Sequence, residues 1–213
     1  MRIVDDRYSN DRGRLELALR FLRHEARTQT IRVWTGLSDD RIRKLHRAYC
    51  TRIPMLVPRH RGKSPHQVSY FTRSPRLKEE TAVLASLLTL IGVMQAQAAE
   101  SSLAAQSPAD QEQTQYGVAR GMLLCQAFEA YRALIPSAQI SFEHAVFLTA
   151  ALSRGDQLRL DTCKECGGLV VVDRFPLRDP RCRHCTHAAL AKQGACDGAT
   201  ADGCAVNTEE FPS

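Results

Sequence analysis

The chain has 213 residues, of which 44% are hydrophobic, and it carries a formal net charge of +6. That length suits one large domain or two small ones with a buried core. The longest apolar window, residues 82–94, is too short to cross a bilayer, and the N-terminus lacks the apolar segment of a signal peptide. We therefore expect a soluble, cytoplasmic protein whose clustered cysteines bind metal instead of forming disulfides.

The positive charge is concentrated in the first third of the chain. Residues 1–75 hold 17 Lys and Arg against 7 Asp and Glu, whereas the remaining residues hold 12 against 16. Such asymmetry favours a polyanion, above all nucleic acid, as the partner of this segment. A well-solvated, arginine-rich helix surface is the alternative explanation.

Two helices are predicted at the start of the chain. Residues 9–34 place apolar side chains at steps of three and four, which is typical of an amphipathic helix. Gly36 predicts a turn, and Ser38 is a good N-cap for a second helix over residues 39–50. Short helices joined across a tight turn are the pattern of a helix-turn-helix, in which the second helix enters a major groove.

The second of these helices has a buried stripe and a basic remainder. The predicted stripe consists of Ile42, Leu45 and Tyr49. The cations left on its other faces, our candidates for DNA contact, are Arg41, Arg43, Lys44 and Arg47. Two residues depart from the helix-turn-helix pattern: Arg32 replaces a small residue and Thr35 replaces an apolar one. An ordinary helical hairpin with a charged outer face is the alternative.

Residues 51–75 contain four prolines and are predicted to form an extended loop. The loop is strongly basic, and it either follows a phosphate backbone or serves as a solvated linker. Its candidate phosphate contacts are Arg59, Arg61 and Lys63. Tyr70 and Phe71 indicate that the far end of the loop packs onto the core.

Three further helices are predicted in the middle of the chain. The first, residues 77–99, is apolar enough to require burial, in its own core or against another subunit. The second, residues 107–134, has Ser107 as its N-cap and Pro108 in its first turn, and it ends before Pro136. Its expected buried residues are Val118, Met122, Cys125, Phe128 and Tyr131. The third begins after Ser141 and ends at Gly155. Cys50 and Cys125 fall within helical patterns and are predicted to be small core residues.

Four cysteines form the strongest motif in the sequence. Two Cys-x-x-Cys pairs stand fifteen residues apart. Each pair presents two sulfurs to one ion, and Gly167 with Gly168 lets the first turn close tightly. We expect one structural zinc per chain in a zinc-ribbon-like unit, with a short hairpin between the two pairs. The expected ligands are Cys163, Cys166, Cys182 and Cys185.

Four protein ligands would fill the coordination sphere of zinc, whereas a catalytic zinc keeps one position open for water. The sequence also has no HExxH, GxSxG or phosphate-binding glycine loop. We therefore expect no enzyme. Two exposed redox-active Cys-x-x-Cys pairs are the alternative. Arginines close to the pairs are further candidates for phosphate contact, namely Arg174, Arg178, Arg181 and Arg183.

The predicted fold is mainly α. A helical body with the helix-turn-helix-like segment spans residues 1–155, the zinc-binding unit spans residues 156–190, and a flexible tail spans residues 191–213. The tail is rich in Gly, Ala, Asp and Thr, and its Cys196 and Cys204 are not assigned to the metal site.

These segments together resemble the FlhC family, the C subunit of the FlhD–FlhC transcriptional activator. "GLSDDRIRKLHRAY" is similar to the family's LS-x-x-R-[IL]-x-K-L-[YH] segment, and "RGKSP" before Tyr70 and Phe71 is similar to its proline-rich loop. "CKECGGLVV" and "CRHC" are similar to its CxxCGG-x-[FL]-[IV] and CxxC. The likeness covers roughly residues 12–187, and its motifs follow in the family's order.

The resemblance implies a helical body with a four-cysteine zinc site. It also implies a complex with an FlhD-like partner, typically four D and two C subunits, that binds double-stranded promoter DNA and recruits RNA polymerase. Members of the family control flagellar genes, and relatives on mobile elements activate conjugative transfer. A zinc-stabilised adaptor that binds only protein is the other function class compatible with the residues.

Overall fold

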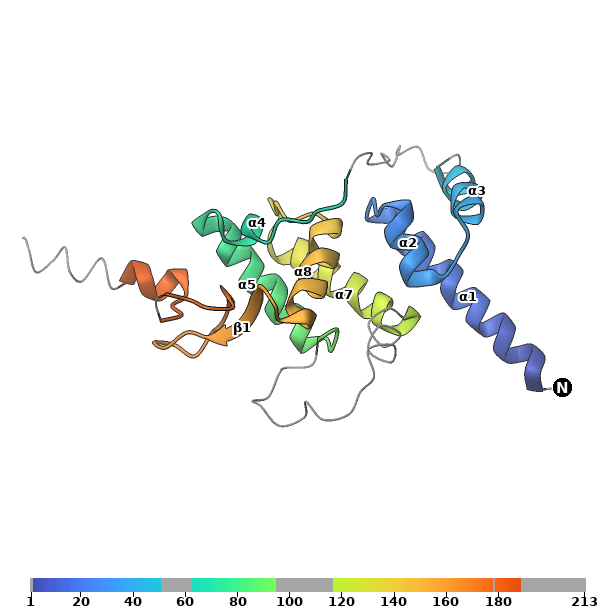
Figure 1. The fold of residues 1–213 in the computed structure, drawn as a ribbon. Helices are drawn as coiled ribbons and strands as arrows, with labels where there is room; N and C mark the ends of the chain where they lie inside the picture. The colour runs from blue at the N-terminus through green and yellow to red at the C-terminus, as the bar shows by residue number, and fades with distance from the viewer. Residues whose placement is uncertain (1, 51–62, 95–116, 178, 189–213) are drawn as a thin grey trace, which may run out of the picture.

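The computed structural model describes residues 2–50, 63–94, 117–177 and 179–188, and it confirms a mainly helical fold that ends in a small four-cysteine unit. Figure 1 shows α1, α2 and α3 grouped on one side of the molecule and the hairpin with the cysteine unit on the other. The elements are α1 (Arg2–Arg23), α2 (Thr28–Thr35), α3 (Asp39–Cys50), α4 (Ser69–Thr72), α5 (Pro75–Leu90), α7 (Val118–Leu134), α8 (Phe142–Arg154), β1 (Leu158–Thr162) and β2 (Leu169–Asp173).

The prediction of a single helix over residues 9–34 is wrong, because the chain breaks between α1 and α2. Glu25 adopts a left-handed φ of 61°. The N–H of Ala26 donates to the carbonyl of Phe21 (2.9 Å), and the N–H of Glu25 donates to that of Leu22 (3.0 Å). This pair of bonds is the Schellman ending of a helix, which usually has glycine in the left-handed position. Glutamate stands there instead, so the sequence carried no stop signal.

The predicted turn between α2 and α3 is confirmed. Gly36 is left-handed (φ 68°), and its N–H donates to the carbonyl of Arg32 (2.8 Å). The Oγ of Ser38 accepts from the N–H of Arg41 (3.4 Å), as expected of an N-cap. Thr35 is buried, yet its hydroxyl donates to the carbonyl of Ile31 (2.6 Å). The hydrogen bond lets Thr35 occupy a buried position at which a helix-turn-helix usually has an apolar residue.

A buried carboxylate caps α2 from another helix. No side chain of its own N-terminus caps α2. Glu143 of α8 instead accepts from the backbone N–H of Arg27 (2.8 Å) and from the hydroxyl of Thr30 (3.0 Å). The first turn of a helix has N–H groups without helical partners and favours negative charge. Glu143 thus fixes the position of the first helix of the helix-turn-helix-like segment on the helical body.

The core lies between α1, α5, α7 and α8, with α2 and β2 at its margins. Phe21, Phe128 and Phe142 pack edge to face or tilted, and Tyr131 is fully buried beside them. Ser141 caps α8 and Gly155 ends it with a left-handed φ of 63°, as predicted. Burial of Cys125 is likewise confirmed. The side chain of Cys50 lies outside the described residues.

Two predicted boundaries need correction, and a third lies outside the described residues. The helix expected over residues 77–99 begins at Pro75 and ends at Leu90, because Gly92 is left-handed (φ 83°) and the N–H groups of residues 93 and 94 return to the carbonyl of Leu88. The loop expected over 51–75 contains the helical turn α4, which buries Phe71 completely as predicted. The expected start of the 107–134 helix lies outside the described residues, which contain α7 from Val118 onwards.

The apolar surface of α5 is covered within the chain. Leu77, Leu84, Ala85 and Leu88 are buried against α4, α7, α8 and β2. Leu90, at the end of the helix, stays 82% exposed. Of the two predicted alternatives, burial in the chain's own core is therefore the correct one for most of the length of α5.

Glycine allows α7 to approach α1 and α2 closely. A Cβ at Gly121 would lie 2.6 Å from Cδ2 of Leu17 and 3.2 Å from Cε3 of Trp34. Both neighbours are buried in the core and have little room to move. We expect Gly121→Val to lower the free energy of unfolding by about 2 kcal/mol through overpacking. Urea denaturation measures this, with Ala119→Val on the exposed face of α7 as the matched control. An equal effect in both variants would contradict the close approach.

Candidate functional site

The four predicted ligands come together at one end of the molecule. Cys163 directly follows β1, and Cys166 lies in the turn before β2. Cys182 directly precedes a short helical segment over residues 183–188, which contains Cys185. All four sulfur atoms lie within 4.8 Å of one another. Cys163 is buried, whereas Cys166 is exposed. In the part of the chain that the structure describes, this is the one group of His, Cys, Asp or Glu side chains arranged to hold a metal ion.

The prediction of a hairpin between the two cysteine pairs is wrong. β1 precedes the first pair and β2 follows it, so the first pair occupies the loop of the hairpin itself. The strands are antiparallel, with Leu160 opposite Val171. Leu158 at the start of β1 is fully buried in the core of the helical body. In β1, leucines alternate with charged residues over only five positions, which is too short a pattern to predict a strand. The partner strand also follows only after the cysteine loop.

Backbone hydrogen bonds shape the cysteine loop. The N–H of Cys163 donates to the carbonyl of Gly168 (2.8 Å), and the N–H of Gly167 donates back to Cys163 (2.8 Å). Gly167 has a φ of 71°, where a side chain is disfavoured. The N–H of Lys164 reaches the carbonyl of Pro180 (3.1 Å) and joins the first cysteine pair to the second. The predicted role of the two glycines in closing the turn is consistent with this geometry.

The protein surrounds one sulfur with N–H donors. Backbone N–H groups of Cys182 and Cys166 donate to the sulfur of Cys163 and lower the pKa of that thiol to about 6. The N–H of Cys182 lies 3.3 Å from it. In contrast, hydrogen bonds to the sulfurs of Cys182 and Cys166 raise the pKa of the Cys185 thiol to about 12. A thiolate is the form that binds metal, so the donors at Cys163 favour the ligand state.

One sulfur–sulfur distance in the cluster matches that of a tetrahedral zinc site. Four thiolates at about 2.3 Å from a zinc ion stand about 3.8 Å apart. The sulfurs of Cys166 and Cys182 are separated by 3.7 Å. That distance is far beyond the ~2.05 Å of a disulfide, and the five cysteines whose side chains the structure describes are all free thiols. The four cysteines are therefore positioned to hold a metal ion.

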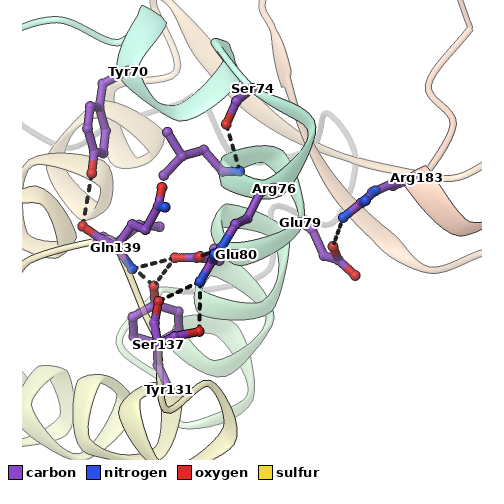
Figure 2. Close-up of polar contacts among 11 residues, drawn as sticks. Tyr70, Ser74, Arg76, Glu79, Glu80, Tyr131, Ser137, Gln139 and Arg183 are labelled. Carbon is purple, nitrogen blue, oxygen red and sulfur yellow. Dashed lines mark hydrogen bonds and ion pairs between the residues drawn. The ribbon is translucent and has the colours of Figure 1, made fainter.

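The cysteine unit is fastened to helix α5. Nη1 of Arg183, between the two cysteines of the second pair, lies 2.6 Å from Oε2 of Glu79, which Figure 2 shows pointing away from the core toward the unit. β2 packs against the same helix. This link was not predicted from the sequence, because nothing in the spacing of Glu79 and Arg183 shows that they meet.

Three of the four candidate arginines around the cysteine unit have partners within the chain. Arg181 pairs with Glu165 (3.2 Å), and Arg183 pairs with Glu79 as described. Arg174 donates to the carbonyl of Gly155 (2.5 Å) and stands over the ring of Phe175. Arg178 lies outside the described residues. The apolar tip after β2 is exposed, with Phe175 at 81% and Leu177 fully accessible.

The basic face of α3 is exposed, as predicted, and carboxylates of the same chain lie beside part of it. The exposed side chains are Arg41, Arg43, Lys44 and Arg47. Arg41 pairs with Asp11 of α1 (3.4 Å), and Arg43 pairs with Asp40 (3.0 Å). Lys63 is exposed too, whereas Arg59 and Arg61 lie outside the described residues. Arg32 is exposed and lies 3.9 Å from Asp39, so it does not separate the two helices.

The predicted buried stripe of α3 needs one correction. Ile42 is buried and Leu45 is half-buried against the core. Tyr49 is only half-buried, and its hydroxyl accepts from Nε of Arg23 (2.6 Å). A tyrosine ring on a helix surface keeps its polar tip accessible to such donors. Arg23 and Asp11 thus tie the two ends of α3 to α1.

In the ranges that the structure describes, no helix is long and apolar enough to span a membrane. No protein-family model and no curated protein matches the chain in sequence, so the cysteine cluster and the exposed basic helix stand as its candidate sites on geometry alone.

Proposed function

We propose that the chain is the DNA-binding subunit of a hetero-oligomeric transcriptional activator of the FlhC type. It binds double-stranded promoter DNA together with an FlhD-like partner and recruits RNA polymerase. The regulated genes serve flagellar assembly or conjugative transfer. The protein acts in the cytoplasm and is not an enzyme.

One arrangement carries the proposal. α2 and α3 meet across the left-handed Gly36, and α3 turns its apolar side to the core while its cations remain exposed. A helix placed in this way is suited to a major groove, with its cations near phosphates. The charge excess of the first third of the chain supports the same partner.

Zinc is the proposed metal, bound once per chain by Cys163, Cys166, Cys182 and Cys185. Four thiolates are typical of a structural zinc and leave no open position for water. When bound, zinc supplies a cross-link between the two cysteine pairs and no reaction. The cysteines hold the ion, and Arg183 and β2 hold the unit against α5.

A protein-binding adaptor is the second candidate, and a specific feature favours it. Arginines that the DNA-binding proposal needs are partly neutralised by carboxylates of the same chain, as at Arg41 and Arg43. Phe175 and Leu177 present an exposed apolar tip of the kind that anchors protein interfaces. The following measurement separates the two candidates.

Neutralising α3 should weaken DNA binding. For Lys44→Gln with Arg47→Gln we expect about a tenfold or greater loss of affinity for promoter DNA, and a salt slope lower by about 0.9 for each lost phosphate contact. Fluorescence anisotropy over a salt titration measures both. The protein is tested alone and co-expressed with an FlhD-like protein.

The matched control is Arg132→Gln with Arg154→Gln, which removes two exposed cations from α7 and α8. Its affinity should stay close to that of the wild type. If the wild type binds DNA in neither preparation, or if binding hardly changes with salt, the activator proposal fails. Retained partner binding without any DNA affinity would support the adaptor.

A further inference from the structure

Asp11 on α1 faces the basic surface of α3. Its Oδ2 lies 3.4 Å from Nη2 of Arg41, in the first turn of α3. The two side chains are 51% and 46% exposed. A carboxylate from a different helix therefore lies beside one of the cations that the proposed function directs at phosphate.

We propose that Asp11 competes with nucleic-acid phosphate for Arg41 and thereby limits the affinity of the chain for DNA. This inference rests on the proposed function. An exposed ion pair contributes little net stability, so a phosphate opens it at small cost. The freed carboxylate then stands close to the phosphate and repels it, by an amount that salt screens. The repulsion limits binding most at low ionic strength.

Asp11 allows a cleaner test than Asp40, which pairs with Arg43. Asp40 lies in the first turn of α3, where a negative charge also stabilises the helix through its dipole. Its replacement would change the folding of α3 and the charge together. Asp11 lies in the interior of the 22-residue α1, far from either end, so its charge has no such role.

The test compares Asp11→Asn with the wild type on a mixed-sequence duplex of about 30 base pairs, which exceeds two turns of DNA. We expect about threefold to tenfold tighter binding near 50 mM salt, a salt slope steeper by up to about 0.9, and a smaller gain near 200 mM. In an Arg41→Ala background the same substitution should give little gain. Glu16→Gln removes an equal charge from an exposed position of α1 and is the matched control.

Each outcome decides the matter. A wild type that binds DNA, with no gain in Asp11→Asn, overturns this inference and leaves the proposed function intact. A gain that persists without Arg41, or that Glu16→Gln reproduces, reflects net charge and also overturns it. If neither the wild type nor Asp11→Asn binds, both proposals fall. Binding by Asp11→Asn alone would contradict the proposed function, because the natural chain would not bind DNA, and this inference would fall with it.

Discussion

Removal of the metal should destabilise the whole protein. With the cysteine unit stripped by a chelator, or in Cys182→Ala, we expect the free energy of unfolding to fall by at least about 4 kcal/mol, as for a ligand present at a thousand times its Kd. For a chain of this size that corresponds to roughly 10 °C in Tm. The loss of stability extends to the helical body, because the hairpin that holds the first cysteine pair buries Leu158 in the helical core.

Metal analysis must accompany the thermal melts. We expect one zinc per wild-type chain and less than stoichiometric zinc in Cys182→Ala. The matched control is Cys125→Ala, which removes a buried thiol of α7 that lies outside the cluster. It should keep its zinc and lose only packing energy. Unchanged stability after verified removal of the metal would show that the cluster does not support the fold.

Loss of Glu80 should have the second large effect. Glu80 is only 2% exposed, and Figure 2 shows its carboxylate among polar groups of three segments. It accepts from the hydroxyl of Tyr131 (2.7 Å), the N–H of Gln139 (2.8 Å) and Nε of Arg76 (2.9 Å). Glu80→Ala leaves these donors without their acceptor, so we expect a loss of about 3–5 kcal/mol in urea denaturation.

The neighbouring Glu79 provides the control for Glu80. Its side chain is 55% exposed and pairs with Arg183 at the surface. Glu79→Ala should therefore cost less than about 1 kcal/mol. Equal losses in the two variants would contradict the assignment of Glu80 as the buried acceptor that joins α5 to α7 and the segment before α8.

The same carboxylate makes stability depend on acid pH. Burial acts to raise the pKa of Glu80, but hydrogen bonds from Tyr131, Gln139 and Arg76 outweigh it and lower the pKa below 4.5. A pKa that is lower in the folded state adds stability above the unfolded value, and this stability is lost as the pH falls through the folded pKa. The wild type should weaken below pH 4.5, and Glu80→Ala should show a flatter dependence in that range.

Local signals carried most of the correct sequence predictions. Gly36, Ser38, Ser141 and Gly155 act through their own backbone conformation or side-chain reach, and each ends or begins a helix as predicted. The two Cys-x-x-Cys pairs likewise form their turns within a few residues. Such features depend on near neighbours in the chain, and a single sequence displays them.

The failures have a different origin. Glu25 takes a conformation that glycine usually takes, so the end of α1 was not visible. β1 has only five residues, too few for its pattern to predict a strand without knowledge of its partner. The ion pair of Asp11 with Arg41 joins residues 30 positions apart, and that of Glu79 with Arg183 joins residues 104 positions apart. Contacts at such separations depend on how the helices pack, and no local pattern encodes them.

The sequence alone determined the helical class, the four cysteines and the basic residues of α3. Tertiary structure decided that α5 is covered within the chain, that the cysteine hairpin packs into the helical core, and that Asp11 of α1 pairs with Arg41 of α3. The physical reason is that residue type and spacing fix local conformation and ligand chemistry, whereas burial and ion pairing depend on which surfaces the folded chain brings together.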